Sequence, residues 1–138
     1  LARAARNIDF IRPHLPYDGA CGRFRALAAK YGFIQRYRAE KTAVTGIACE
    51  PWHFRYVGAP HAQLIEQNGL CLEEYAAFLR EMGPQQCRLA GGRAAQVLYV
   101  PCENGHARLP GGCVQVSGDN AGGFIATVWQ AGARRCGA

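Results

Sequence analysis

The segment from Glu50 to Gly58 constrains the fold more than any other part of the chain. Its sequence, EPWHFRYVG, alternates aromatic side chains with polar or small ones, which is typical of a strand with two different faces. Along a regular strand the aromatic side chains share one face and pack into a core, while His53 and Arg55 share a polar face that is open to a ligand. Pro51 cannot donate a ladder hydrogen bond, so we expect an irregular backbone there, with Glu50 on the approach to the strand.

Helical periodicity dominates the rest of the first half. Apolar residues recur at helical spacing between Asp18, which can cap a helix, and Gly32, which can end one. The period returns after Pro60, which suits a first helical turn. The sequence predicts helices over about 18–31 and 60–67 and a third from 72 to the Gly83-Pro84 stop, strands over 33–37 and 47–57, and a polar connection over 38–46.

The composition changes after Pro84. Residues 85–138 hold most of the glycines and form short apolar runs separated by turns such as Asp119–Asn120, to which we assign no site. Strands are expected over 96–100, 113–116 and 124–129. The chain is therefore predicted to be α+β, with a first domain over residues 1–83 and a small β-rich appendage over residues 84–138.

Charge and hydropathy exclude several partners. Sixteen Lys and Arg against ten Asp and Glu give a net charge of +6, but only Arg134 and Arg135 are adjacent, so we expect a solvated surface and no nucleic-acid partner. No apolar stretch approaches the ~18 residues of a membrane span, so no span is expected in this chain. The opening residues lack the apolar core of a signal peptide, and the start at Leu1 favours a piece of a longer protein.

The seven cysteines contain no Cys-x-x-Cys pair, which argues against a zinc ribbon or a redox motif. Their odd number and wide spread favour isolated, partly buried thiols. A pairing among the last four stays open, and the cysteines indicate little about function.

A carboxylate three residues before an imidazole, as in Glu50 and His53, suits hydrolysis at zinc. His53 can bind the metal through a neutral ring nitrogen, while Glu50 can take a proton from metal-bound water. The helical HExxH arrangement, which needs two histidines four apart, is absent. On spacing alone, a solvated strand face is the more frequent explanation of such a pair.

A longer ordered pattern surrounds this pair, made of Asn7 to Ile11, Tyr31-Gly32-Phe33-Ile34, Arg36-Tyr37, Lys41, Thr45-Gly46, Glu50 to Gly58, His61, Gly69-Leu70 and Leu72-Glu73-Glu74-Tyr75. In this order and spacing the chain closely resembles the VanY-type D-alanyl-D-alanine carboxypeptidases, which are zinc peptidases that trim peptidoglycan stem peptides. The resemblance covers roughly residues 7–80, and so long an ordered set is far more specific than Glu-x-x-His alone.

The resemblance implies an α+β fold in which an antiparallel sheet carries Zn2+. It implies that His53 is a zinc ligand and that Glu50 is the catalytic base, which passes its proton to the leaving amine. It also implies two substrate-binding residues. Trp52 either shapes the site or serves packing, and Arg55 meets either the substrate carboxylate or a structural ion-pair partner.

The sequence also departs from the family. The other two zinc ligands of the family come from an upstream Ser-x-His-x-x-Gly-x-Ala-x-Asp motif that this sequence lacks, and the arginine that steadies the oxyanion also lies upstream. The remaining histidines do not replace them, because His61 is expected to be structural and His14 and His106 to be exposed. One imidazole cannot hold catalytic zinc, since such sites use three protein ligands. We therefore expect this polypeptide alone to be inactive and its full-length parent to be a peptidase. Cys71 is a smaller departure, because a hydroxyl residue would cap the helix better there.

Three functions stay open from the sequence. The leading prediction is a zinc-dependent D,D-carboxypeptidase that removes the terminal D-alanine from peptidoglycan stem peptides ending in D-Ala-D-Ala. The alternatives are a D,D-dipeptidase or another cell-wall peptidase of the family, and a non-catalytic cell-wall binding module. The implied substrate predicts a location at the bacterial cell envelope, outside the cytoplasm.

Overall fold

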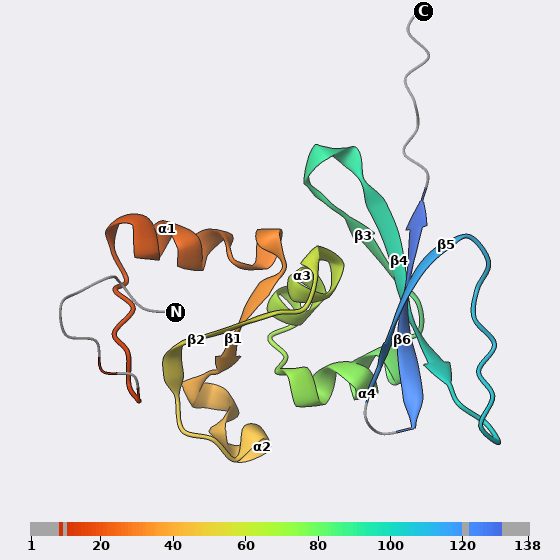
Figure 1. Cartoon of the computed structure of the whole chain (residues 1–138), viewed down its shortest axis with the longest axis horizontal. Helices are drawn as coiled ribbons and strands as arrows, with labels where there is room; N and C mark the ends of the chain where they lie inside the picture. The colour runs from red at the N-terminus through yellow and green to blue at the C-terminus, as the bar shows by residue number, and fades with distance from the viewer. Residues whose placement is uncertain (1–8, 10, 120–121, 131–138) are drawn as a thin grey trace, which may run out of the picture. The chain divides into compact units, whose positions relative to one another are not determined.

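The computed structural model describes residues 9, 11–119 and 122–130 of the chain, apart from the side chain of Cys113. Its contacts divide the chain into two compact units, residues 1–74 and 75–138. Helices and two antiparallel sheets make up these units (Figure 1), which confirms the α+β class. The predicted domain boundary after residue 83 stays a prediction. In the described part, no helix is long and apolar enough to cross a lipid bilayer.

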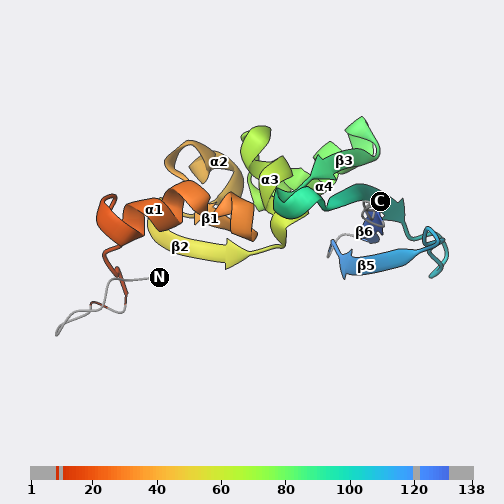
Figure 2. The same ribbon diagram turned by 90° about the horizontal axis from the view of Figure 1, so that it is seen from above.

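The first unit is built around a two-stranded antiparallel ribbon, in which β1 (Phe33–Tyr37) pairs with β2 (Glu50–Tyr56). Figure 2 shows β2 along one side of this unit, with β1 between it and α2. The helical elements of the unit are α1 (Gly19–Leu27), η1 (Ala29–Tyr31), η2 (Ala39–Lys41), α2 (Thr42–Thr45), α3 (Ala59–Gln67) and the first turn of α4 (Leu72–Met82). The helices and strands predicted in this half are therefore confirmed.

The strand pairing is irregular at the proline of β2. Gln35 lies opposite Phe54, but two residues further along β1 Tyr37 lies opposite Glu50. A single residue of β1 therefore faces the three β2 residues 51–53, which form a bulge. The proline in this bulge has no N–H to donate to the ladder, so the predicted irregularity is confirmed.

Two aromatic residues of β2, Phe54 and Tyr56, lie against aromatic side chains of α1 and β1. The ring of Phe24 lies edge to face with Phe54 at 4.9 Å and with Phe33 at 5.9 Å between centroids. Phe33 in turn contacts Tyr56 at 5.2 Å. Tyr56 nevertheless exposes 64% of its surface, and Trp52 is half-buried. The expected aromatic core is thus a cluster at the surface, while the buried core of this unit is aliphatic and includes Ile34, Ala62, Leu64 and Ile65.

The ends of α1 depend on backbone rather than side-chain contacts. Asp18 stands at the N-cap position, but its side chain makes no capping hydrogen bond, contrary to the prediction; its carbonyl accepts the N–H of Gly22 at 2.7 Å. A Cβ atom at Gly22 would lie 2.3 Å from the carbonyl oxygen of Tyr17, so this position requires glycine. After η1 the chain turns at Gly32 with φ +87°, which confirms the predicted end.

The segment 38–46 was predicted to be a polar connection, and it instead forms the short helical turns η2 and α2. Thr42 Oγ1 donates to the Ala39 carbonyl at 3.0 Å, and Gly46 ends α2 with φ +68°. Because these turns bury no residue, the sequence shows no helical repeat of apolar residues there.

His61 lies in the first part of α3, where burial lowers its pKa from the ordinary 6.5 to about 4. The imidazole is therefore neutral in the folded protein near pH 7. This is consistent with the structural role predicted for His61.

Acid is expected to destabilise the first unit through His61. Between pH 6.5 and 4 the unfolded chain takes up a proton on this ring and the folded chain does not. The unfolding free energy should therefore fall by about 3 kcal/mol across this window and change no further through His61 below it. Urea unfolding at a series of pH values measures the effect. His61→Gln should remove it and exposed His14→Gln should not, whereas equal pH profiles for His61→Gln and wild type would contradict this prediction.

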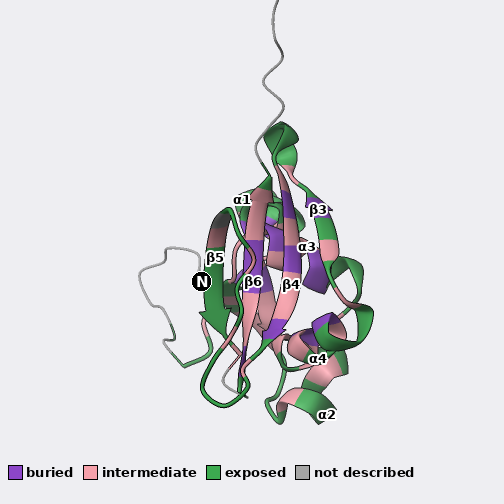
Figure 3. Cartoon of the chain, turned by 90° about the vertical axis from the view of Figure 1, so that its right-hand side faces the viewer, coloured by how far each residue is buried: buried purple, intermediate pink, exposed green. Residues whose placement is uncertain are grey.

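The second unit contains a four-stranded antiparallel sheet in the order β3-β4-β6-β5 (Figure 3). Its strands are β3 (Gln85–Arg88), β4 (Ala94–Pro101), β5 (Cys113–Gly118) and β6 (Gly123–Gln130). The three strands predicted in this half are confirmed. β3 was missed because it contains a single buried residue, Cys87, among polar ones.

The cysteines whose side chains are described are free thiols, two of them buried. This confirms the predicted isolated thiols for Cys21, Cys49, Cys71, Cys87 and Cys102. Cys136 and the Cys113 side chain lie outside the described residues, as do Asn7, Ile8, Phe10, Asn120, Arg134 and Arg135.

A buried carboxylate organises the turn between β5 and β6. The Asp119 side chain is 1% exposed, and its Oδ2 accepts hydrogen bonds from Arg80 Nη2 at 2.7 Å and Tyr99 Oη at 3.1 Å. Its Oδ1 accepts the backbone N–H of Gly123 at 2.8 Å. Arg80 also lies over the Tyr99 ring, 4.4 Å from its centroid. The acidic residue of this predicted turn therefore joins α4, β4 and β6.

Asp119→Asn is expected to destabilise the second unit by about 2 kcal/mol, because it removes the charge from hydrogen bonds to three donors. Hydrogen exchange of the Gly123–Gln130 amides measures the loss. Glu103→Gln, at an exposed carboxylate of the same unit, is the matched control and should change exchange little. Equal protection of these amides in Asp119→Asn and wild type would contradict the expected loss.

Candidate active site

Glu50 and His53 form a direct side-chain pair at the start of β2. His53 Nδ1 lies 2.8 Å from Glu50 Oε2, and the two side chains are 44% and 30% exposed. In a regular strand, residues three apart face opposite sides and are separated by about 10 Å along the chain. The bulge at residues 51–53 removes this separation, so both groups meet on one side of the strand.

The contact also assigns roles to the two nitrogens of the imidazole. The carboxylate of Glu50 is an acceptor, so Nδ1 of His53 carries the proton and donates it. Nε2 then has its lone pair free in the neutral ring, and it makes no hydrogen bond to another residue in the described part of the chain. A carboxylate that fixes a histidine in this tautomer is a common arrangement beside metal-binding nitrogens.

The two predicted substrate-binding residues lie apart from this contact. Arg55 is exposed and stands opposite Ile34 in the ladder, and no hydrogen bond or ion pair joins it to Glu50 or His53 within the described ranges. Trp52 is half-buried in the bulge itself, between the two site residues in sequence. Their binding roles stay predictions.

The described residues do not form a complete metal site. No group of three or more His, Cys, Asp or Glu side chains in the described ranges is placed to hold an ion. His14 and His106 are exposed, as predicted. A catalytic zinc site uses three protein ligands, and this part of the chain offers one imidazole with one carboxylate at its side. Zinc therefore does not fit the described residues alone, and we derive no step through it.

Three ion pairs connect β1 and the turn after it to the helices of the first unit. Arg36 donates to both carboxylate oxygens of Glu73, at 2.9 and 2.5 Å. Arg38 pairs with Glu66, and Lys41 Nζ lies 2.8 Å from Glu74. The hydrogen bond from Arg36 holds the pKa of Glu73 below its usual value, and that from Lys41 does so for Glu74. Both carboxylates therefore stay ionised near pH 7.

The start of α4 is capped by a carboxylate, although Cys71 lacks a hydroxyl. The backbone N–H of Cys71 donates to Glu74 Oε2 at 2.8 Å, which is one half of a capping box. Glu74 thus caps α4 and binds Lys41. This compensates for the departure noted in the sequence.

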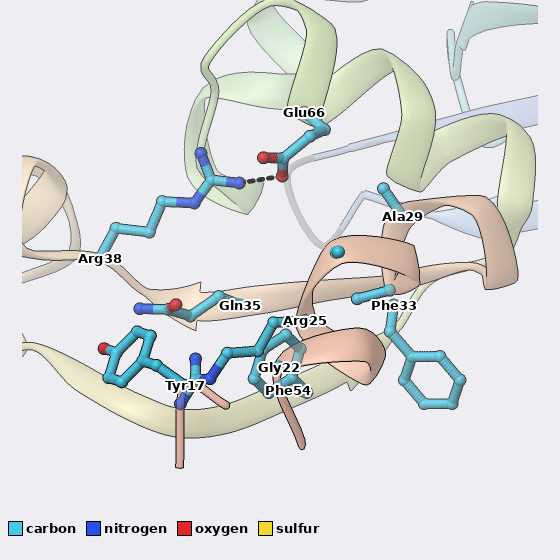
Figure 4. A pocket seen from close by; sticks show the side chains of 11 residues that line it. Tyr17, Gly22, Arg25, Ala29, Phe33, Gln35, Arg38, Phe54 and Glu66 are labelled. Carbon is cyan, nitrogen blue, oxygen red and sulfur yellow. Dashed lines mark hydrogen bonds and ion pairs between the residues drawn. The ribbon is translucent and has the colours of Figure 1, made fainter. Parts of the chain in front are cut away.

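A pocket of about 460 Å³ lies next to the aromatic cluster of the first unit (Figure 4). Arg25 is fixed in its wall, because Nη2 donates to the Leu15 carbonyl at 2.7 Å and the guanidinium lies 4.0 Å from the Tyr17 ring centroid. The Arg38–Glu66 ion pair forms another part of the wall, and Gln35 is drawn between it and Tyr17. The pocket residues were missed by the sequence analysis, because no spacing connects them, and they do not include Glu50 or His53.

Comparison with known proteins finds a family match in the first unit. Residues 11–59 match the VanY family, described as D-alanyl-D-alanine carboxypeptidase. The matched range contains β1, the bulge and the Glu50–His53 pair. The resemblance to the VanY family inferred from the sequence is therefore confirmed over this range.

Individual relatives support the same assignment. The chain is 39% identical over 103 residues to a D-alanyl-D-alanine carboxypeptidase of Enterococcus faecium, a match that covers 74% of this chain and 34% of the relative. It is 47% identical over 73 residues to the bifunctional D-Ala-D-Ala dipeptidase and D-Ala-D-Ala carboxypeptidase VanXYC of Enterococcus gallinarum, which covers 53% of this chain and 38% of that protein. The chain thus spans a little more than a third of these curated relatives.

A solved structure shares the fold of this chain. It is the vancomycin resistance D,D-dipeptidase VanXYg in complex with a D-Ala-D-Ala phosphinate analogue, with a TM-score of 0.83 and 41% sequence identity. The match covers 94% of this chain and 54% of VanXYg. Because it includes most of the residues after 84, the β-rich part of this chain has a counterpart in that peptidase.

Proposed function

We propose that this chain supplies Glu50 and His53 to the active site of a zinc-dependent D,D-carboxypeptidase that removes the terminal D-alanine from peptidoglycan stem peptides. The observation that carries the proposal is the 2.8 Å contact between Glu50 and His53, made possible by the bulge in β2. The names of the relatives support a substrate that ends in D-Ala-D-Ala.

Each of the four residues has one role in this proposal. Glu50 is the base that takes a proton from the attacking water and passes it to the leaving amine, and its partly exposed carboxylate is accessible to both. His53 is the zinc ligand that this chain offers, through Nε2, and two further ligands would come from outside the described residues. Trp52 and Arg55 bind the substrate. Arg55 pairs with the terminal carboxylate of the substrate.

The 138-residue polypeptide by itself is expected to release no D-alanine from a peptide ending in D-Ala-D-Ala, with or without added zinc. The reason is that the described residues bring one imidazole, that of His53, to the candidate site and form no group of three metal ligands, which a catalytic zinc site needs. Enzymatic detection of free D-alanine measures this, with the Glu50→Gln polypeptide as the blank. Release above that blank would show that the ligand set is complete within the chain and would contradict this prediction.

An exchange protein tests the proposed function. It is the E. faecium relative with its matched segment replaced by the corresponding 103 residues of this chain. We expect this exchange protein to release D-alanine from a pentapeptide ending in D-Ala-D-Ala. If the exchange protein folds and binds zinc but releases none, the carboxypeptidase proposal is wrong.

A D,D-dipeptidase is the second candidate, because VanXYg carries that description and was solved with an analogue of the dipeptide. The exchange protein separates the two activities when free D-Ala-D-Ala and the pentapeptide are supplied in parallel. Cleavage of the dipeptide alone would favour the second candidate. Binding of the pentapeptide without cleavage of either substrate would favour a binding module. For the carboxypeptidase, we propose a location at the bacterial cell envelope, outside the cytoplasm, because its stem-peptide substrate belongs to peptidoglycan.

A further inference from the structure

Tyr37 contacts the imidazole of the site from the neighbouring strand. Its ring centroid lies 5.1 Å from that of His53, and the two ring planes are at 85°, which is an edge-to-face arrangement. Tyr37 also stands directly opposite Glu50 in the ladder. One residue of β1 therefore adjoins both members of the pair.

The bulge creates this arrangement. If the register that places Gln35 opposite Phe54 continued without interruption, Trp52 would stand opposite Tyr37. The two extra residues of β2 move Glu50 into that place and leave His53 beside the Tyr37 ring. Bulges re-aim side chains next to functional sites, and here the re-aimed side chain meets a ring that can fix its plane.

Tyr37 is itself held from its own strand. The guanidinium of Arg36 lies 4.6 Å from the centroid of the Tyr37 ring, and both carboxylate oxygens of Glu73 bind that guanidinium. The Tyr37 carbonyl accepts a hydrogen bond from Gln35 Nε2 at 3.3 Å. A continuous line of contacts thus runs from Glu73 on α4 through Arg36 and Tyr37 to His53.

We propose that Tyr37 is a positioning residue of the site: its ring, held by the Arg36–Glu73 ion pair, fixes the plane of the His53 imidazole so that Nδ1 stays on Glu50. The proposal rests on the proposed function for its catalytic meaning, but its geometry is independent of activity. The observed contact is between the two rings, so the proposal assigns no role to the hydroxyl of Tyr37. Phenylalanine at position 37 should therefore keep the orientation of the His53 ring, and leucine should not.

The geometry is tested by NMR of the 138-residue protein. Wild type and Tyr37→Phe should show ring-to-ring NOEs between residues 37 and 53, a ring-current displacement of the His53 ring protons, and NOEs from these protons to Glu50. Tyr37→Leu should lose the displacement and weaken the NOEs to Glu50. Tyr31→Leu, at an exposed ring outside this line, should change none of them. A Tyr37→Leu protein that keeps wild-type His53 shifts and Glu50 NOEs would overturn the proposal.

A second pair of variants tests the positioning role of Tyr37 if Tyr37→Leu does not fold. Glu73→Gln weakens the clamp on Arg36, whereas Glu66→Gln weakens the neighbouring ion pair to Arg38. Only the first should move the His53 ring signals. Equal effects of the two variants on these signals would overturn the proposal.

The exchange protein then separates this proposal from the proposed function. In the exchange protein, Tyr37→Leu should lower kcat by about tenfold to a hundredfold at nearly unchanged KM, because misplacing a catalytic group by up to about 1 Å costs rate rather than binding. Tyr37→Phe should recover the wild-type kcat. If the NMR result holds and the exchange protein is inactive, the positioning stands and the proposed activity is wrong. If the exchange protein is active and its Tyr37→Leu variant has the same kcat, the positioning role is wrong.

Discussion

Replacing Gly32 by alanine is expected to destabilise the first unit by about 4 kcal/mol, the largest stability loss expected of any variant considered for this chain. Gly32 has φ +87°, and a Cβ atom there would lie 2.7 Å from Tyr56 Cε2 and 2.9 Å from both the amide nitrogen of Ala59 and the carbonyl carbon of Gly58. Two of these three neighbours are backbone atoms, which cannot swing aside. The Gly32 carbonyl also accepts the N–H groups of Val57 and Gly58, at 2.8 and 3.2 Å, so a shift there would disturb the end of β2.

Gly46→Ala is the matched control for Gly32→Ala. Gly46 also has a positive φ, +68°, but a Cβ atom there would meet nothing within 4 Å. Its substitution should therefore cost only the backbone strain, about 1 kcal/mol. Urea unfolding of both variants, with hydrogen exchange of the β1 amides, measures the difference. Equal losses of unfolding free energy in the two variants would show that the atoms close to Gly32 do not exclude a side chain at this position.

Glu50→Gln in the exchange protein is expected to lower kcat by about 10²- to 10⁴-fold, with little change in KM. The amide keeps the size of the side chain and can still accept the hydrogen bond from His53 Nδ1, which is 2.8 Å away in the native pair. It cannot take a proton from water. The variant thus removes proton transfer and leaves the geometry of the pair.

Glu40→Gln is the control for this experiment, because Glu40 is an exposed carboxylate in η2. It should leave kcat unchanged. Zinc content and the circular dichroism of each variant are measured alongside the rates, so that loss of metal or of fold is recognised. A fully active, zinc-loaded Glu50→Gln protein would remove Glu50 from its proposed role.

The sequence predicted the local elements of the fold well, because their signals are local. Gly32 and Pro60 marked an end and a start of helices, and alternating residues marked the strands. The exceptions have a common cause. β3 and the turns η2 and α2 bury too few side chains to leave an apolar pattern, so nothing in the sequence distinguishes them from loops.

The residues of the candidate site were predicted, but their geometry was not. The proline indicated an irregular strand, yet only the register of β1 against β2 shows that Glu50 and His53 are thereby brought into contact. Register depends on pairing between distant residues, which periodicity within one strand cannot reveal. The contact of Tyr37 with His53 was hidden for the same reason.

The rate of D-alanine release by the exchange protein is the most direct measurement of whether Glu50 and His53 of this chain belong to a D,D-peptidase site. It is measured with a pentapeptide ending in D-Ala-D-Ala, beside the unmodified E. faecium relative and the Glu50→Gln variant. We predict release within about a hundredfold of the unmodified relative, since small displacements of transplanted groups cost up to that factor, and far above the Glu50→Gln variant. A folded, zinc-loaded exchange protein that releases no more D-alanine than its Glu50→Gln variant would contradict the assignment.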